Sequence, residues 1–304
     1  MPELIVPTVA DAARIAAAIN ARAQALFGIT EESAECVERW FALPNLDPPA
    51  DMRLAVGADG SAEGYADVGA PDGGGAKAYV DLRVAPGHGQ ALAALFAWTE
   101  SRAVERAGAG GVIWYFVPVE DETMQRLLAG SGYAVVRSSY EMGCSLEGEL
   151  EPPVWPDGIE IVPFDEAHAE AVHAAQEEAF SDHWGFEPGS LESWRAYNLS
   201  ESEDATLWRI AWAGEEVAGV CLNRPQHGED ETVGWVGVLA VRRPFRRRGL
   251  GEALLRESFR TFAERGKRSA GLGVDAENTT GAVALYERVG MHVVRRSDTW
   301  QRRV

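Results

Sequence analysis

Cysteine is scarce in this chain of 304 residues, which contains only Cys36, Cys144 and Cys221. An odd number of widely separated cysteines fits neither a disulfide framework nor a zinc site with closely spaced ligands. We therefore expect a protein of the reducing cytoplasm, with no metal ion among its cofactors.

Long apolar runs are also missing. No stretch approaches the roughly 18 consecutive apolar residues of a transmembrane helix. The first residues, Met1 to Leu4, lack a basic stretch followed by an apolar signal core. The sequence therefore predicts neither a membrane anchor nor an export signal.

Basic residues are outnumbered. The chain has 28 Lys and Arg against 47 Asp and Glu, a formal net charge of −19. A surface with this charge repels nucleic acids and anionic membranes, and it attracts cations. We therefore expect no nucleic-acid or membrane partner, and the charge favours a small amine as the ligand.

Apolar residues make up 46% of the sequence, which is typical of a globular protein, and the length favours two domains. Residues 147–157, EGELEPPVWPD, combine three prolines with four carboxylates, the composition of a surface linker. We therefore predict a first domain at residues 1–148 and a second at residues 158–304.

The two halves repeat one order of predicted elements. Each begins with two helices and three strands, followed by a helix, a strand and a helix that ends at a glycine. In the first half these lie at residues 8–27, 30–41, 52–56, 63–68, 77–84, 90–107, 112–118 and 123–130. In the second they lie at residues 165–180, 190–197, 206–213, 216–223, 232–241, 252–266, 269–274 and 281–289. The order predicts two copies of one mixed α/β unit.

Residues 238–255, VLAVRRPFRRRGLGEALL, predict a strand, a basic turn and then an amphipathic helix. Unpaired backbone N–H groups and the helix dipole make the start of a helix a site for anions. Gly249 and Gly251 would let a diphosphate approach the backbone, and five arginines lie within residues 242–248. The segment fits neither a Walker loop nor a dinucleotide fingerprint.

Two motifs here resemble those of the GNAT acyltransferase superfamily. Residues 246–251, RRRGLG, match [RQ]-x-x-G-x-[GA], and residues 278–291, NTTGAVALYERVGM, match N-x-x-x-A-x-x-x-Y-x-x-x-G-F except for Met291. The resemblance covers residues 158–304 by motif and residues 1–146 by layout, as in tandem members such as mycothiol synthase. It implies two GNAT-type domains, each a mixed, mostly antiparallel sheet flanked by helices, with acetyl-CoA as co-substrate of an N-acetyltransferase.

The resemblance also implies roles for single residues. Leu239 and Val241 would pair with the pantetheine arm, and the Val241 N–H would stabilise the oxyanion. Tyr286 would return a proton to the thiolate as general acid while an amine attacks the thioester directly. The implied cofactor-binding residues are Leu239, Ala240, Val241, Arg246, Arg247, Arg248, Gly249, Leu250, Gly251, Glu252 and Asn278.

The general base has several candidates. Glu231, at the start of the predicted strand 232–241, is the candidate catalytic base on that strand. Glu178, Asp182 and His183 are the alternatives, because they fall where the resemblance places the substrate side.

The first half is predicted to be degenerate. Its Gly87-His88-Gly89 aligns with Gly249-Leu250-Gly251, but five residues and the basic cluster before it are missing. Leu128 takes the position of Tyr286. We therefore expect no productive CoA binding in this domain.

Simpler interpretations of the same residues stay open. Tyr286 could be a core aromatic, Asn278 a helix-start residue, and residues 246–251 a solvated helix cap. A non-catalytic protein that binds CoA and responds to it is therefore the alternative function.

Overall fold

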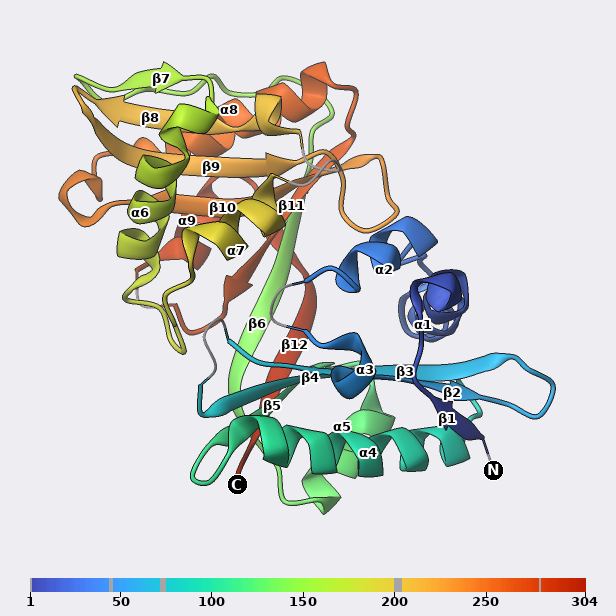
Figure 1. Ribbon diagram of the computed structural model, residues 1–304. Coiled ribbons are helices and arrows are strands. Elements are labelled where there is room, and N and C mark those ends of the chain that lie inside the picture. The colour runs from blue at the N-terminus through green and yellow to red at the C-terminus, as the bar shows by residue number, and fades with distance from the viewer. Residues whose placement is uncertain (1, 44–45, 72–74, 200–203, 279) are drawn as a thin grey trace. The chain divides into compact units, whose positions relative to one another are not determined.

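The computed structural model describes residues 2–43, 46–71, 75–199, 204–278 and 280–304. The chain forms two compact units, shown in Figure 1: unit 1 is Met1–Ser138 with Ser297–Val304, and unit 2 is Ser139–Arg296. Both contain helices and a mixed sheet, so the predicted mixed α/β fold class is confirmed. Within the described ranges, no helix is both long and apolar enough to cross a membrane.

Unit 1 has a mostly antiparallel sheet. Its strands follow the order β1, β2, β3, β4, β5, β12, and among these described strands only β4 and β5 run parallel. The strands are β1 (Glu3–Ile5), β2 (Met52–Val56), β3 (Ala62–Gly69), β4 (Lys77–Val84), β5 (Val112–Pro118) and β12 (His292–Arg303). The helices are α1 (Ala12–Phe27), α2 (Ala34–Trp40), α3 (Pro48–Asp51), α4 (Gly89–Ala107) and α5 (Glu122–Gly130).

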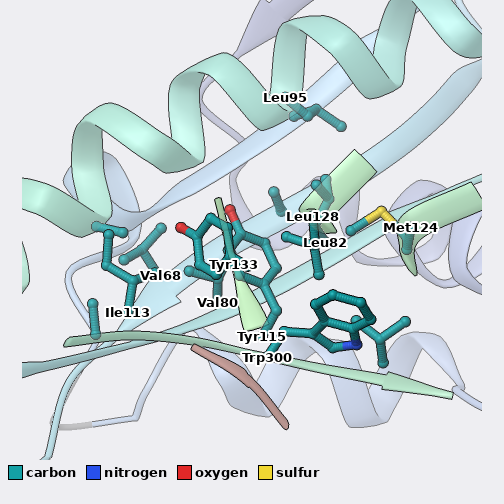
Figure 2. Packing of buried hydrophobic residues seen from close by; sticks show 14 of the residues in the cluster. Val68, Val80, Leu82, Leu95, Ile113, Tyr115, Met124, Leu128, Tyr133 and Trp300 are labelled. Atoms are coloured by element: carbon teal, nitrogen blue, oxygen red, sulfur yellow. The ribbon is translucent and has the colours of Figure 1, made fainter. Parts of the chain in front are cut away.

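The core of unit 1 follows from strand periodicity. Successive side chains of a strand point to opposite faces of the sheet, so Ala78, Val80 and Leu82 of β4 are buried on one face. They pack with Leu95 of α4 and Leu128 of α5, and Figure 2 shows this packing. The alternation along β4 therefore sets which face the helices α4 and α5 cover.

Unit 2 repeats this sheet. Its strands follow the order β6, β11, β10, β9, β8, β7, and among them only β10 and β11 run parallel. The strands are β6 (Ala134–Ser145), β7 (Glu160–Val162), β8 (Arg209–Ala213), β9 (Glu216–Arg224), β10 (Val233–Val241) and β11 (Ser269–Asp275). The helices are α6 (Ala169–Phe180), α7 (Leu191–Asn198), α8 (Leu250–Glu264) and α9 (Ala282–Arg288).

The boundaries between the two units lie after Ser138 and after Arg296, and not in the predicted linker at residues 147–157. Residues 139–145 of β6 pair with β11 in unit 2. Residues 297–303 of β12, the last strand in the chain, pair with β5 in unit 1. Each half of the chain therefore supplies the final strand of the other unit, an exchange that no local composition marks.

Trp300 provides a test of this strand exchange, because it is buried in the core of unit 1 although it belongs to the second half of the sequence. We expect Trp300→Ala to destabilise unit 1 by about 3–5 kcal/mol, with Arg303→Ala, at an exposed position of the same strand, as the control. Urea unfolding gives the magnitude. Amide hydrogen exchange should show a loss of protection in β5. A loss of protection confined to the strands of unit 2 would contradict the strand exchange.

Candidate functional site

The strands β10 and β11 part in the middle of the sheet of unit 2. Their parallel pairing runs from Val233 opposite Ser269 to Val236 opposite Leu272, although β10 continues to Val241 and β11 to Asp275. The register of β10 against β9 shifts between Val236 and Val238, so Gly237 is an extra residue there. Such a bulge bends a strand. We call the resulting gap between the ends of β10 and β11 the wedge.

The backbone of β10 is available on the wedge side. The Arg242 N–H donates to the Ala218 carbonyl of β9 at 3.0 Å. Because backbone groups alternate along a strand, the N–H and C=O of Leu239 and Val241 point away from β9. The Val241 carbonyl agrees with this, since it accepts from Arg246 Nε at 3.0 Å. An extended ligand could therefore pair with β10 from the wedge.

The loop from β10 to α8 ends in a run of unpaired amides. Arg247 has a φ of 61°, the one positive φ of a non-glycine residue in the described ranges, and Gly249 has a φ of 84°. Among the described residues, none accepts a hydrogen bond from the backbone amides of residues 247–252. Nor does a side chain cap α8. Unpaired amides at the start of a helix, together with the helix dipole, favour an anion, so this loop keeps the features for which an anion site was predicted.

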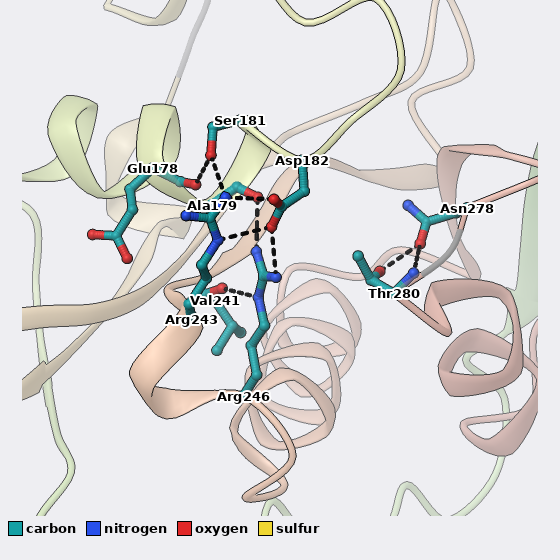
Figure 3. Close-up of polar contacts among 9 residues, drawn as sticks. All are labelled: Glu178, Ala179, Ser181, Asp182, Val241, Arg243, Arg246, Asn278 and Thr280. Carbon is teal, nitrogen blue, oxygen red and sulfur yellow. Dashed lines mark hydrogen bonds and ion pairs between the residues drawn. The ribbon is translucent and has the colours of Figure 1, made fainter.

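Two arginines of this loop clamp the end of α6, as Figure 3 shows. Arg246 donates to the Val241 carbonyl at 3.0 Å, to Asp182 Oδ2 at 3.0 Å and to the Ala179 carbonyl at 2.9 Å. Arg243 Nε donates to the same Asp182 oxygen at 2.9 Å. Hydrogen bonds from these two guanidinium groups hold the pKa of the Asp182 carboxyl well below its usual range. The clamp therefore joins the end of β10 to the segment that follows α6.

Other arginines of the basic cluster also have partners in the protein. Arg242 forms an ion pair with Glu178 at 2.6 Å. Arg248 donates to the Asp157 carbonyl at 3.3 Å. Arg247 has no side-chain partner among the described residues. The side chain of Arg247 and the backbone amides beside it are therefore the groups of this loop without a partner among the described residues, and their contact with a cofactor stays a prediction.

Tyr286 lies on α9 and is 7% exposed. It belongs to the apolar cluster that also contains Leu239 and Val241. A Cβ added to Gly251 would lie 3.3 Å from Leu285 Cδ2 and 3.7 Å from Val241 Cγ2, so α9 closely approaches the start of α8 and the end of β10. Burial raises the pKa of the Tyr286 phenol, and the neighbouring Cys221 raises it further. The phenol therefore keeps its proton at neutral pH.

Asn278 occupies the turn between β11 and α9. Its Oδ1 accepts from the Thr280 amide at 2.7 Å, and it also accepts from the Thr280 hydroxyl (Figure 3). This contact shapes the turn, and Thr279 lies outside the described residues. The structure thus gives the side-chain oxygen of Asn278 a local partner, and its contact with a cofactor stays a prediction.

Glu231 is separated from the other predicted site residues. It is exposed and precedes β10, and the eight residue steps from Val233 to Val241 span about 26 Å at 3.3 Å per residue. The structure therefore does not bring Glu231 to the end of β10. Strand length is the physical reason, because the wedge lies at the other end of the same strand.

His183 is the remaining nitrogen base among the predicted candidates. Its ring packs edge-on against Phe180 with 4.4 Å between centroids. Burial lowers the pKa of its imidazole below the ordinary 6.5; Arg246 also lowers it, while Asp275 and Asp182 act in the opposite direction. His183 directly follows Asp182 of the clamp, and its lowered pKa keeps the imidazole neutral at neutral pH.

The parallel pair of unit 1, β4 and β5, also parts before its strands end, but the loop that follows β4 is different. Pairing between β4 and β5 ends at Val80 and Tyr115. Four residues, 85–88, connect β4 to α4, whereas eight residues, 242–249, connect β10 to α8. The Leu128 carbonyl accepts from the Tyr133 N–H at 3.0 Å, as Tyr286 does from Met291 at 3.0 Å. Leu128 therefore occupies the position of Tyr286, as the alignment of the two halves predicted.

The chain is similar in sequence to known acetyltransferases. Residues 169–291 match the family model described as the acetyltransferase (GNAT) family. Mycothiol acetyltransferase from Geodermatophilus obscurus is 31% identical over 268 residues, covering 82% of this chain and 81% of that protein. The match to mycothiol acetyltransferase from Corynebacterium efficiens, also 31% identical, covers only 42% of each.

Solved structures extend the similarity to the whole chain. A GCN5-related N-acetyltransferase from Sphaerobacter thermophilus is 33% identical with a TM-score of 0.81, covering 99% of this chain and 95% of that one. A tandem GNAT protein from the clavulanic acid biosynthesis pathway shares the fold at 17% identity, with a TM-score of 0.72 and coverage of 100% and 98%.

Gly249 and Gly266 flank α8 and allow a matched test of the anion site. Both have a positive φ, and a Cβ added at either meets nothing within 4 Å, so the backbone strain of a valine is comparable. We expect Gly249→Val to weaken CoA binding by roughly tenfold or more, the effect of losing one hydrogen bond to a charged group. Gly266→Val should leave it unchanged. Calorimetric titration should give one CoA per wild-type chain; equal affinities of the two variants would contradict the site.

Proposed function

Because this chain belongs to the GNAT acetyltransferase family, we propose that unit 2 transfers the acetyl group of acetyl-CoA to the nitrogen of a small amine. One observation carries the proposal: the wedge between β10 and β11 leads directly to the unpaired amides of residues 247–252. A donor with an extended amide-containing arm and a diphosphate matches this arrangement. The relatives described as mycothiol acetyltransferases support transfer to a small molecule.

The donor would lie along β10. Its pantetheine amides would pair with the backbone of Leu239 and Val241, and its diphosphate would accept from the amides of residues 247–252. The Val241 carbonyl is already hydrogen bonded to Arg246. Its N–H points to the same edge, away from β9, and would donate to the thioester oxygen, which becomes negatively charged as the amine attacks.

The reaction needs no acyl-enzyme. The neutral amine attacks the thioester carbon, a C–N bond forms and the C–S bond breaks. The departing thiolate takes the proton of the Tyr286 phenol, and the proton released by the nitrogen restores the phenol. Tyr286 suits this role because its buried phenol is protonated at neutral pH.

His183 is the group we propose to remove the first proton from the incoming ammonium. Glu178 is ion-paired with Arg242, and hydrogen bonds from Arg243 and Arg246 lower the pKa of Asp182, which makes Asp182 a poor base. The imidazole of His183 is neutral at the working pH and lies near Asp275 at the wedge. General bases work best when their pKa lies near the working pH.

Unit 1 would not take part in the chemistry. We propose that it lacks a productive CoA site, because its loop of residues 85–88 is half the length of the loop in unit 2. Leu128, fully buried at the position of Tyr286, has no proton to donate. Its role would be to provide a scaffold.

Thiol release from acetyl-CoA, measured with a panel of amines, aminoglycosides and polyamines, tests the activity, and Tyr286→Phe tests the acid. We expect the variant to lower kcat by roughly 100-fold, the lower end of what a general acid contributes. CoA affinity should stay within twofold, because only one hydroxyl is removed. Unchanged turnover would remove Tyr286 from the mechanism. Tight CoA binding without thiol release for any amine would favour a non-catalytic CoA-responsive protein.

His183→Gln tests the base through its pH dependence. The wild-type kcat/KM should rise with pH through the pKa of His183, which lies below 6.5, because only the neutral imidazole accepts a proton. The variant should lose this rise and retain CoA affinity. His292→Gln, at an exposed position in unit 2, is the control. A rise of the same midpoint in His183→Gln would assign the titration to another group.

A further inference from the structure

One face of the sheet of unit 2 carries several glycines on the neighbouring strands β11 and β6. Along β11, Ala270, Leu272 and Val274 are buried in the cluster beside α8 and α9. Strand alternation therefore turns Gly271 and Gly273 to the opposite face. On β6, Met142 and Cys144 belong to the same cluster, so Glu141 and Gly143 also lie on the opposite face.

Packing accounts for two of these glycines. A Cβ on Gly271 would lie 2.7 Å from the Trp235 ring, and a Cβ on Gly143 would lie 3.1 Å from Val294 Cγ2. Gly273 is different, because it is exposed and a Cβ added there meets nothing within 4 Å. Glycine weakens a strand, and where it occurs it marks a bulge, a tight bend, or the close approach of a ligand or another backbone. No described residue occupies the space that a side chain at position 273 would fill.

Gly273 also lies at the wedge. The pairing of β11 with β10 ends at Leu272, so Gly273 is the first residue beyond it. Asp275, two residues further along β11, shares the face of Gly273 and influences the charge of His183. The helix α6, which His183 follows, packs on this same side of the sheet, because its residues cluster with Val238 and Ala240 of β10 and not with the residues beside α8 and α9.

A carboxylate borders this open surface. Glu141 is the register partner of Gly273 in the antiparallel pair of β6 and β11. Side chains at such positions lie about 5 Å apart at Cβ. Glu141 Oε1 is 3.7 Å from His227 Nε2 and Oε2 is 3.5 Å from an Arg295 nitrogen. Burial alone would raise the pKa of Glu141, but His227 and Arg295 lower it below its ordinary value, so the carboxylate is ionised.

An aromatic wall stands beside the same surface. The ring of Trp235 lies against Gly271, and the ring of His227 stacks on it with 3.7 Å between centroids and 10° between planes. His227 thereby connects the tryptophan to Glu141. A flat apolar wall next to a carboxylate suits the carbon skeleton and the charged end of an alkylamine.

We propose that the acceptor binds on the surface over Gly273, with its ammonium group beside Glu141 and its carbon skeleton against Trp235. The class of acceptor is a small primary amine that is cationic in solution. This inference rests on the proposed transfer of acetyl groups. In this proposal, Glu141 holds the amine near the wedge, and His183 removes the proton there.

Gly273→Val is the direct test, because the added side chain displaces nothing and a β-branched residue suits a strand. We expect CoA affinity and thermal stability to be retained while the acceptor kcat/KM falls at least tenfold. Gly69→Val is the matched control, since Gly69 lies in β3 of unit 1 and a Cβ there also meets nothing within 4 Å. Equal kcat/KM in Gly273→Val and wild type would overturn the proposal while leaving the transferase activity established.

Glu141→Gln tests the charge at constant shape. We expect the KM for a cationic amine to rise about tenfold with the affinity for CoA unchanged. Glu264→Gln, which removes one exposed carboxylate at the end of α8, controls for net charge. A rise in KM of the same size in both variants would show a general field effect and would contradict a site at Glu141.

A binding measurement keeps the proposal testable without turnover. Butylamine and spermidine, titrated into the CoA-saturated protein, should shift the backbone amide signals of Gly271 and Gly273 and the indole signal of Trp235. Glu141→Gln should weaken this binding about tenfold, so that the same shifts require about ten times more amine. If neither amine moves these signals in the wild type, the acceptor site is refuted. Absence of thiol release together with the expected shifts would refute only the proposed catalysis.

Discussion

The parting of β10 from β11 is the constraint on which the functional arrangement of unit 2 depends. Backbone N–H and C=O groups inside a sheet normally find partners on both neighbouring strands. Here the pairing of β10 with β11 ends at Val236, so the backbone groups of Leu239 and Val241, which point away from β9, have no neighbouring strand to pair with. The same parting uncovers Gly273 on β11. The donor side and the proposed acceptor surface therefore arise from one break in pairing.

Charge has two separate uses around this break. In a chain with a net charge of −19, the arginines of residues 242–248 mainly neutralise carboxylates at the end of α6. Exposed ion pairs of this kind contribute little stability one by one, but a shared carboxylate such as Asp182 fixes geometry. The amides of residues 247–252, whose orientation is set by the backbone, are the groups proposed to bind the anion.

The two units show how one architecture can keep its sheet and differ at its site. Both have a parallel pair that parts after four residues of register. The difference lies in the loop before the following helix and in one residue, Tyr286 against Leu128. Neither change touches the strands that form the core. A fold of this type can therefore be retained where the residues for phosphate binding and proton donation are absent.

The sequence by itself determined the mixed α/β class, the repeated order of elements and the family, because these follow from local periodicity and from two motifs of short range. It also predicted the unpaired amides, since a strand, a glycine turn and a helix are contiguous in the chain. Only the tertiary structure decided the strand exchange, the separation of Glu231 from the wedge, and the pairing of Arg246 with Asp182. It alone placed Glu141 opposite Gly273. These depend on contacts between residues far apart in sequence, which no local pattern encodes.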